Sequence, residues 1–211
     1  MKMSTIKKAL AVTLAMTMVM ASAMTVCATE GTGNHKKSSG KSSSTKASTT
    51  VVSAGGSVSV GGASVQTSVN GTYAATKIKG AAIQTPIEQV VAALGLKDGQ
   101  KPFVTIYDTD PEKSPAAMAC AEAAAQSIGG SVVAALNIDL GAKEAGKYVT
   151  LSNGSVGMTV GIPSVDATKT YAMVCVQPGG VVTILDDQDT NPATVTFAVQ
   201  AGLGTYAIVA K

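Results

Sequence analysis

Short apolar runs alternate with turn residues throughout residues 147–211. Runs such as VGMTVG, TYAMVCV and GTYAIVA are rich in Val, Ile, Thr and Tyr, and each is bounded by Gly, Pro, Asn or Asp. Runs of this length and composition are typical of β-strands joined by short turns. The pattern therefore predicts an antiparallel β module over residues 147–211.

Apolar and small polar residues also alternate in residues 51–78, and Asn70-Gly71 interrupts the alternation between SV and TY. An Asn-Gly pair is typical of a two-residue hairpin turn, because both central residues of that turn need positive φ. The pattern predicts a hairpin with strands at 63–69 and 72–78. Two further strands are expected at 103–107 and 131–140.

A helical pattern follows at residues 87–94, where apolar residues recur with the spacing i, i+3, i+4 and i+7. Thr85 and Glu88 have the spacing of a capping box, which would satisfy two backbone donors at the helix start. Gly95 is placed to end the helix in the left-handed conformation. We expect the apolar side of this helix to pack into the core.

An alanine-rich second helix is expected at residues 116–128, between Ser114-Pro115 at its start and Gly129-Gly130 at its end. It lies between two predicted strands. It therefore either forms a crossover unit with them or covers one face of a sheet, and the pattern leaves both arrangements open.

The first 28 residues have the three parts of a secretory signal peptide. Lysines come first, an apolar run occupies residues 9–20, and Val26 and Ala28 suit a cut after Ala28. An uncleaved membrane anchor is one alternative. Lipid attachment at Cys27 is another, although Val26 stands where a lipoprotein signal has a smaller residue. We expect cleavage and secretion.

Ser, Thr, Lys and Gly dominate residues 29–50, which contain no branched or aromatic apolar residue. Such a segment cannot bury enough apolar surface to offset the entropy of ordering it. The patterns together predict an α+β chain in which a hairpin region with two helices precedes an antiparallel β-sandwich-like module. Its parts are a signal peptide (1–28), a disordered Ser/Lys/Thr linker (29–50), an α/β region (51–146) and the β module (147–211).

Charge and composition exclude several functions. Cleavage after residue 28 leaves 13 Lys, 13 acidic residues and no Arg or Trp, which argues against nucleic-acid binding. The single histidine, His35, lies in the predicted linker, so Ser–His and Cys–His catalysis lack a base in the folded part. Cys120 and Cys175 could form a disulfide, but we expect them to remain as buried thiols. No cofactor motif is present, and we expect a non-enzymatic protein.

The tyrosines bear on a possible sugar site. Tyr107, Tyr148, Tyr171 and Tyr206 lie in strand patterns and are expected in the core or in cross-strand pairs. Glycoside cleavage by paired carboxylates stays open as an alternative, although sugar sites usually have aromatic platforms and this chain has no Trp. Exposure of two or more tyrosines on one face would favour carbohydrate binding.

Two acidic clusters are candidate Ca²⁺ sites, because carboxylate oxygens at alternate loop positions can chelate this ion. The alternative is structural, since acids before a helix favour its dipole and Asp and Asn form turns. The stronger candidate consists of Asp186, Asp187 and Asp189, and the weaker one consists of Asp108, Asp110 and Glu112.

The last quarter of the chain resembles the β modules that end many secreted and cell-surface proteins of gut Firmicutes. A Tyr-containing strand, a G-x-V-T-x-L-D region and a terminal T-Y-A-x-V strand carry the resemblance. The matching residues are Tyr171, Gly180, Val182, Leu185, Asp186, Thr196, Phe197, Thr205, Tyr206, Ala207 and Val209. The resemblance implies an extracellular β-sandwich-like module without known catalysis.

The expected function is that of a secreted or cell-surface interaction or structural protein with a cell-wall or other extracellular partner. After signal cleavage no membrane association is expected. The alternative is an extracellular module that binds a small ligand or a glycan.

Overall fold

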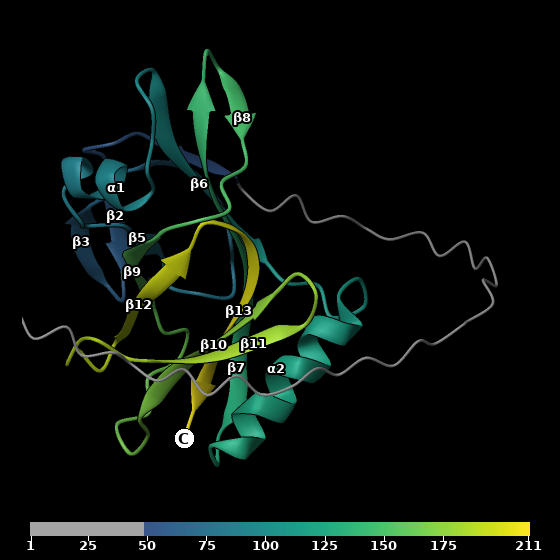
Figure 1. Ribbon diagram of the computed structural model, residues 1–211. Helices are drawn as coiled ribbons and strands as arrows, with labels where there is room; N and C mark the ends of the chain where they lie inside the picture. Colours follow the sequence, from purple (N-terminus) through teal and green to yellow (C-terminus); the bar gives the residue numbers. More distant parts are fainter. Residues whose placement is uncertain (1–48) are drawn as a thin grey trace, which may run out of the picture.

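The computed structural model describes residues 49–211 (Figure 1). The protein is mostly β, with 49% of these residues in strands and 12% in helices. The predicted signal peptide and all but the last two residues of the predicted linker lie outside the described residues. Neither helix in the described part is long and apolar enough to span a membrane.

Eight strands form a large sheet, and every neighbouring pair is antiparallel except β4 and β6, which are parallel. The strand β8 (Lys147–Val149) pairs only with the end of β7. The predicted boundary between residues 146 and 147 runs through this β7–β8 hairpin, and strands from both sides of it share the sheet. The other seven strands lie in the order β1 (Thr50–Val52), β4 (Asn70–Ala74), β6 (Gln100–Asp108), β7 (Ser131–Glu144), β13 (Gly202–Ala210), β10 (Tyr171–Gln177) and β11 (Val181–Asp186).

A small sheet packs against one face of the large sheet. Its strands are β12 (Thr194–Gln200), β9 (Ser155–Gly161) and β5 (Ala81–Ala82), in that order. The main core lies between the two sheets and includes Leu136, Phe197 and Ile208. The two packed sheets agree with a β-sandwich-like fold. The strands of the C-terminal part are antiparallel as predicted, but β9 pairs with β12, and β10 with β13 and β11, so sequence order is not spatial order.

Helix α2 (Pro115–Ser127) covers part of the opposite face of the large sheet (Figure 1). A second core of small side chains lies beneath it and includes Cys120, Ala124 and Val174. Strand β10 is buried on both faces, because alternate residues face the small sheet and α2. This explains why YAMVCV is uniformly apolar instead of alternating.

Both helices form where they are predicted, but the N-cap of α1 is one residue later than predicted. Helix α1 (Ile87–Ala93) and α2 both end at a glycine with positive φ, Gly95 and Gly129. The predicted capping box is wrong, because Pro86 is the N-cap of α1 and no side chain of the described residues caps the helix. The helix begins one residue later than a capping box would need. Strands β6 and β7 are antiparallel neighbours, so α2 covers the sheet and does not form a parallel crossover.

The predicted hairpin turn at Asn70-Gly71 is also wrong. Both residues lie within β4, and the hairpin of this region joins β2 (Ser57–Val60) to β3 (Ala63–Gln66) through Gly61 and Gly62. Gly61 and Gly62 have positive φ, as that turn requires. Gly71 serves a different purpose, since a Cβ there would lie 2.8 Å from a methyl group of Val104 on β6.

The two cysteines lie on opposite faces of the large sheet. Cys175 belongs to the core between the sheets and Cys120 to the core beneath α2, and no disulfide joins them. The expectation of buried thiols is confirmed. Burial raises the pKa of the Cys175 thiol to about 11, so this thiol stays protonated near neutral pH.

Candidate functional site

Helix α2 covers only one end of its face of the large sheet, and the rest of that face carries polar and aromatic side chains. Thr105 pairs with Asp139, Tyr107 pairs with Asn137, and residues paired across strands point to the same side. These residues alternate with core residues such as Leu136 and Ile138, so they point away from the small sheet. We call this region the open face and define it by Thr72, Thr105, Tyr107, Asn137, Asp139 and Tyr148.

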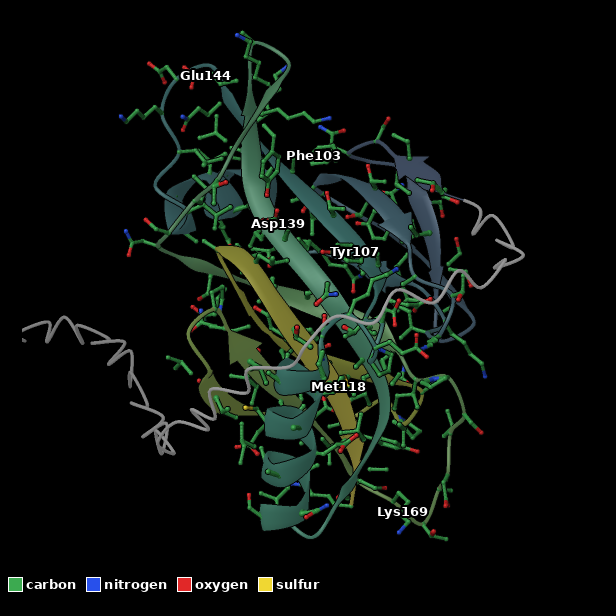
Figure 2. All side chains as sticks on the ribbon, turned by 90° about the vertical axis from the view of Figure 1, so that its right-hand side faces the viewer. Phe103, Tyr107, Met118, Asp139, Glu144 and Lys169 are labelled. Atoms are coloured by element: carbon green, nitrogen blue, oxygen red, sulfur yellow. The ribbon has the colours of Figure 1, made fainter. Side chains whose placement is uncertain are left out.

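The open face runs along β6 and β7 from the tip of the β7–β8 hairpin to the start of α2. Figure 2 shows Phe103, Asp139 and Tyr107 one after another down the sheet, with Met118 of α2 below them. Helix α2 therefore closes one end of the open face.

Two of the four strand tyrosines are exposed on this face. Tyr171 and Tyr206 are 9% and 1% exposed, as expected for core residues, whereas Tyr107 and Tyr148 are 38% and 39% exposed. Tyr148 pairs with Lys143, which is on the same side of β7 as Asp139. The condition that would favour carbohydrate binding, two exposed tyrosines on one face, is met.

Packing holds Tyr148 in place. Its ring meets the ring of Phe103 edge to face, with centroids 6.5 Å apart and an angle of 79° between planes. The Nζ atom of Lys143 lies 3.6 Å from the centre of the Phe103 ring. Gly141 makes room for the tyrosine, because a Cβ there would collide with the Tyr148 hydroxyl. The exposed ring is thus supported from below and is not a loose surface side chain.

Asp139 lies between the two tyrosines along β7. Burial raises the pKa of Tyr148, and a hydrogen bond to the neighbouring Asp139 carboxylate and its negative charge raise the pKa further. The Oδ1 atom of Asp139 is buried and has no hydrogen-bond partner within residues 49–211. Buried polar atoms normally have a partner, so the Asp139 carboxylate beside Tyr148 has acceptor capacity that the described residues do not fully use.

A cavity of about 430 Å³ adjoins the open face where α2 begins. Asn137 and Tyr107 line it, and the side-chain oxygen of Asn137 accepts a 2.8 Å hydrogen bond from Thr205 Oγ1. Ser114 and Gln177 add neutral polar groups. A second cavity, of about 280 Å³, lies at the other end of the face beside Phe103, Lys101 and Lys143. The open face therefore extends from one cavity to the other.

The acids of the first predicted Ca²⁺ cluster make separate contacts. Asp108 accepts hydrogen bonds from the backbone N–H groups of Thr76 and Lys77, at 2.9 and 3.0 Å, and from the Thr76 hydroxyl at 2.6 Å. Partial burial raises the pKa of Asp108, but these hydrogen bonds outweigh it and the net pKa is lowered. Asp108 thus closes the loop that follows β4.

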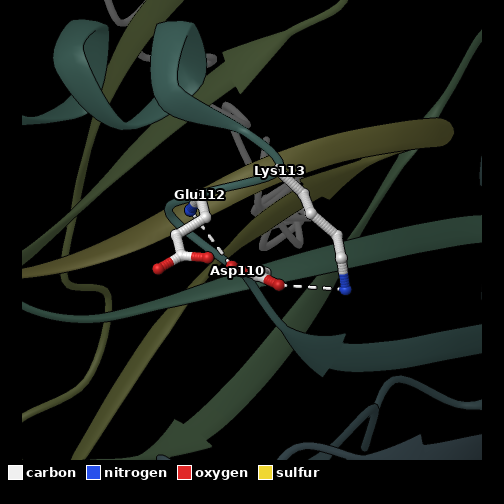
Figure 3. A network of polar contacts seen from close by, with 3 residues as sticks. All are labelled: Asp110, Glu112 and Lys113. Carbon is white, nitrogen blue, oxygen red and sulfur yellow. Dashed lines mark hydrogen bonds and ion pairs between the residues drawn. The ribbon is translucent and has the colours of Figure 1, made fainter. Parts of the chain in front are cut away.

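Asp110 closes its own turn, as Figure 3 shows. It accepts a 3.0 Å hydrogen bond from the Glu112 N–H and forms a 3.0 Å ion pair with Lys113. The hydrogen bond with Lys113 is the main cause of its lowered pKa, and the Glu112 N–H adds to it. The Asp110 carboxylate is engaged within its own turn.

The second cluster protects the edge of the small sheet. Asp187 Oδ1 accepts from the N–H groups of Asp189 and Thr196, at 3.1 and 2.9 Å. Asp189 accepts from the hydroxyls of Thr194 and Thr196 and from the Asn191 N–H. Burial raises the pKa of Asp187 in spite of these donors. The loop thereby satisfies groups on the outer edge of β12.

No three His, Cys, Asp or Glu residues of the described part gather where they could hold a metal ion. Asp186 is exposed, whereas Asp187 and Asp189 accept hydrogen bonds from donors of their own loop and of β12.

Sequence reasoning did not select Asp139 and Asn137. Their signal is the period of two in LNIDL, where polar residues occupy every second position of an apolar strand.

Comparison with known proteins gives no match, whether to a family model, to a curated protein or to a solved structure. The resemblance of the C-terminal strands to exported β modules stays a prediction, and the function is argued from the geometry of the open face.

Proposed function

We propose that the chain is a secreted, non-enzymatic binding module that holds a neutral glycan, or a similar polyhydroxy ligand, on its open face. One observation carries the proposal. Tyr107 and Tyr148 expose their rings on the same face of the large sheet, with Asp139 between them.

The chemistry of the face suits a sugar chain. The C–H side of a sugar ring is apolar and stacks on an aromatic ring, while its hydroxyls need hydrogen-bond partners. Ligand sites combine apolar and aromatic surface with a few placed polar groups, and here the polar groups are Thr105, Asn137 and Asp139. Tyr148 lies over Gly141, and Tyr107 lies beside Asn137. Gly141 and Asn137 are four residues apart on β7, so the two tyrosines are separated by roughly 13 Å along the sheet. This spacing suits an extended ligand better than a single small molecule.

The charges of the face suit a ligand that is bound and not cleaved. Asp139 supplies the one carboxylate among the residues that define the open face, and Lys101 and Lys143 lie at its end beside Phe103, so the face carries charges of both signs and does not select a strongly charged chain. Glycoside cleavage normally uses two carboxylates on either side of the bond, about 5–10 Å apart. A single carboxylate can hold a hydroxyl but lacks the partner that cleavage needs.

Secretion rests on the N-terminal sequence. The predicted signal peptide and the Lys-rich linker support an extracellular location with a cell-wall partner. Fractionation of the producing cells, with mass spectrometry of the mature N-terminus, tests this part. An intact N-terminus in the membrane fraction would contradict it.

Affinity electrophoresis and titration calorimetry against a panel of neutral polysaccharides test the binding. We expect Tyr107→Ala and Tyr148→Ala each to weaken binding about tenfold or more, because each removes a stacking platform. Val165→Ala is the matched control, since Val165 is an equally exposed apolar residue in a loop outside the open face. If no polysaccharide binds, or if both tyrosine variants bind like the control, the alternative of a structural or protein-interaction role is favoured.

A further inference from the structure

The strand at one side of the large sheet, β11, leaves its outer edge without a partner. Strand β10 pairs with its inner edge from Val181 to Asp186. No backbone hydrogen bond within residues 49–211 reaches the outer edge. Alternate N–H and C=O groups of a strand point to either side, so this edge presents a row of unpaired groups.

Edge strands usually carry a feature that discourages pairing, and the small sheet shows one. On β12 the Thr196 N–H donates to Asp187, and the Thr196 carbonyl accepts from the Gln188 N–H at 2.8 Å. In the part of the chain that the structure describes, no side chain or backbone group covers the outer edge of β11 in this way. Its residues from Val181 to Leu185 include no charge and no Pro, and its register with β10 is unbroken.

The apolar side chains of β11 are only half covered. Val181 is 50% exposed, and Val182, Ile184 and Leu185 are each partly exposed, whereas the residues of β10 from Tyr171 to Val176 are all buried. An uncharged, partly exposed apolar edge favours the addition of another strand.

The strand is also complementary to itself in the antiparallel orientation. A two-fold axis through Thr183, at right angles to the sheet, places Thr183 opposite Thr183 of a second copy. Apolar residues then lie opposite apolar residues, and the carboxylates lie at opposite ends, where no like charges meet. The remaining pairs in this register are Val182 with Ile184, Val181 with Leu185 and Asp186 with Gly180.

We propose that β11 pairs with β11 of a second copy, so that two large sheets join into one continuous sheet. The interface is isologous, as a two-fold dimer requires. It buries less surface than a stable dimer normally does, because it consists of one short strand from each copy. The dimer is therefore reversible and forms with a dissociation constant of about 10 μM to 1 mM.

Sedimentation equilibrium of the chain from Thr29 onward, over a wide range of protein concentration, tests the proposal. We expect the mass to rise from that of one chain to that of two. Thr183→Lys places two ammonium groups opposite each other and should weaken the dimer at least about tenfold. Thr183→Asp should do the same with two carboxylates. An equimolar mixture of the two variants should dimerise again, because Lys then faces Asp across the axis.

Thr50→Lys is the matched control, since it makes the same change on β1 at the other side of the sheet. It should leave the dimer unchanged, and thermal melts confirm that every variant is folded. A wild-type chain that stays monomeric at all concentrations overturns the proposal. So does a Thr183→Lys variant that dimerises like the wild type, or a mixture of variants that stays monomeric.

Discussion

The carboxylates of the two acidic loops and the carboxylate of β7 are used in opposite ways. The sequence draws attention to Asp108 and Asp189, and the structure surrounds their oxygens with N–H and hydroxyl donors. Asp139 attracts no attention in the sequence, yet its Oδ1 has no donor among residues 49–211. In this protein the clustered acids of the two loops close turns and protect a strand edge. A single acid on an open sheet face offers an acceptor to a ligand.

The largest effect is expected from Asp189→Ala. The substitution should lower the free energy of unfolding by about 2–3 kcal/mol, because it removes the acceptor for Thr194, Thr196 and the Asn191 N–H at once. Urea unfolding measures this change. Asp186→Ala is the control from the same cluster and should change the stability by less than about 0.5 kcal/mol, since Asp186 is exposed. Equal losses in both variants would remove the distinction between engaged and unengaged acids.

A smaller effect is expected from Asp108→Asn, and it depends on pH. The pKa of Asp108 is lowered in the folded protein, so its charged form contributes stability above its ordinary pKa of 3.8 and loses that contribution as the pH falls through the folded value. The carboxylate is only partly buried, so solvent screens its interactions and the contribution should stay below about 1 kcal/mol.

Melting temperatures of Asp108→Asn and the wild type between pH 2 and 7 test this prediction. The wild type should be more stable at pH 7, and the two curves should converge near pH 2, where Asp108 is protonated. A constant difference across the range would contradict a role for the charge.

Asp139→Asn should change stability by less than about 0.5 kcal/mol, because no donor in the described part depends on the Oδ1 atom and the amide keeps an oxygen that can accept from the Tyr148 hydroxyl. Its effect should appear in ligand binding, where the loss of the charged acceptor weakens hydrogen bonds from hydroxyls. Calorimetry with a polysaccharide that binds the wild type compares the two proteins. A variant that unfolds easily, but binds unchanged, would give Asp139 a structural role like that of the loop acids.

No shift is expected from Ca²⁺. A ligand that binds only the native state raises the melting temperature, and four of the six acids, Asp108, Asp110, Asp187 and Asp189, already accept hydrogen bonds from donors of the chain. Melts with excess Ca²⁺ and with a chelator should therefore coincide. A clear increase with Ca²⁺ would restore the calcium prediction for the acidic loops.

Local patterns were enough to predict most elements of the fold. The period of 3.6 around Val90 and the Pro and Gly signals around α2 located both helices, and apolar runs located the long strands. The pairing of strands was not predictable, because it depends on contacts between distant residues. Gly71 illustrates the difficulty, since the same Asn-Gly pair that forms a turn elsewhere here lets β4 approach β6.

The candidate site was predictable only in part. The sequence suggested that two exposed tyrosines on one face would indicate a sugar site, but it could not say which tyrosines are exposed. Tyr206 and Tyr148 lie in similar strand patterns, and only packing buries the first beneath the small sheet and leaves the second on the surface. Burial of this kind is a property of the assembled layers and not of the local sequence.

The position of β13 has a consequence for how the chain reaches its native state. The last strand of the chain lies in the middle of the large sheet, where it pairs with β7, more than sixty residues earlier, and with β10. The sheet cannot form completely until β13 is available, and pairing between such distant segments is slow. If the chain is exported, as its N-terminal sequence predicts, it would thus stay unfolded enough to pass through a translocation channel until β13 has been synthesised. By the same reasoning, loss of the last ten residues would leave β7 and β10 without a common neighbour and prevent folding altogether.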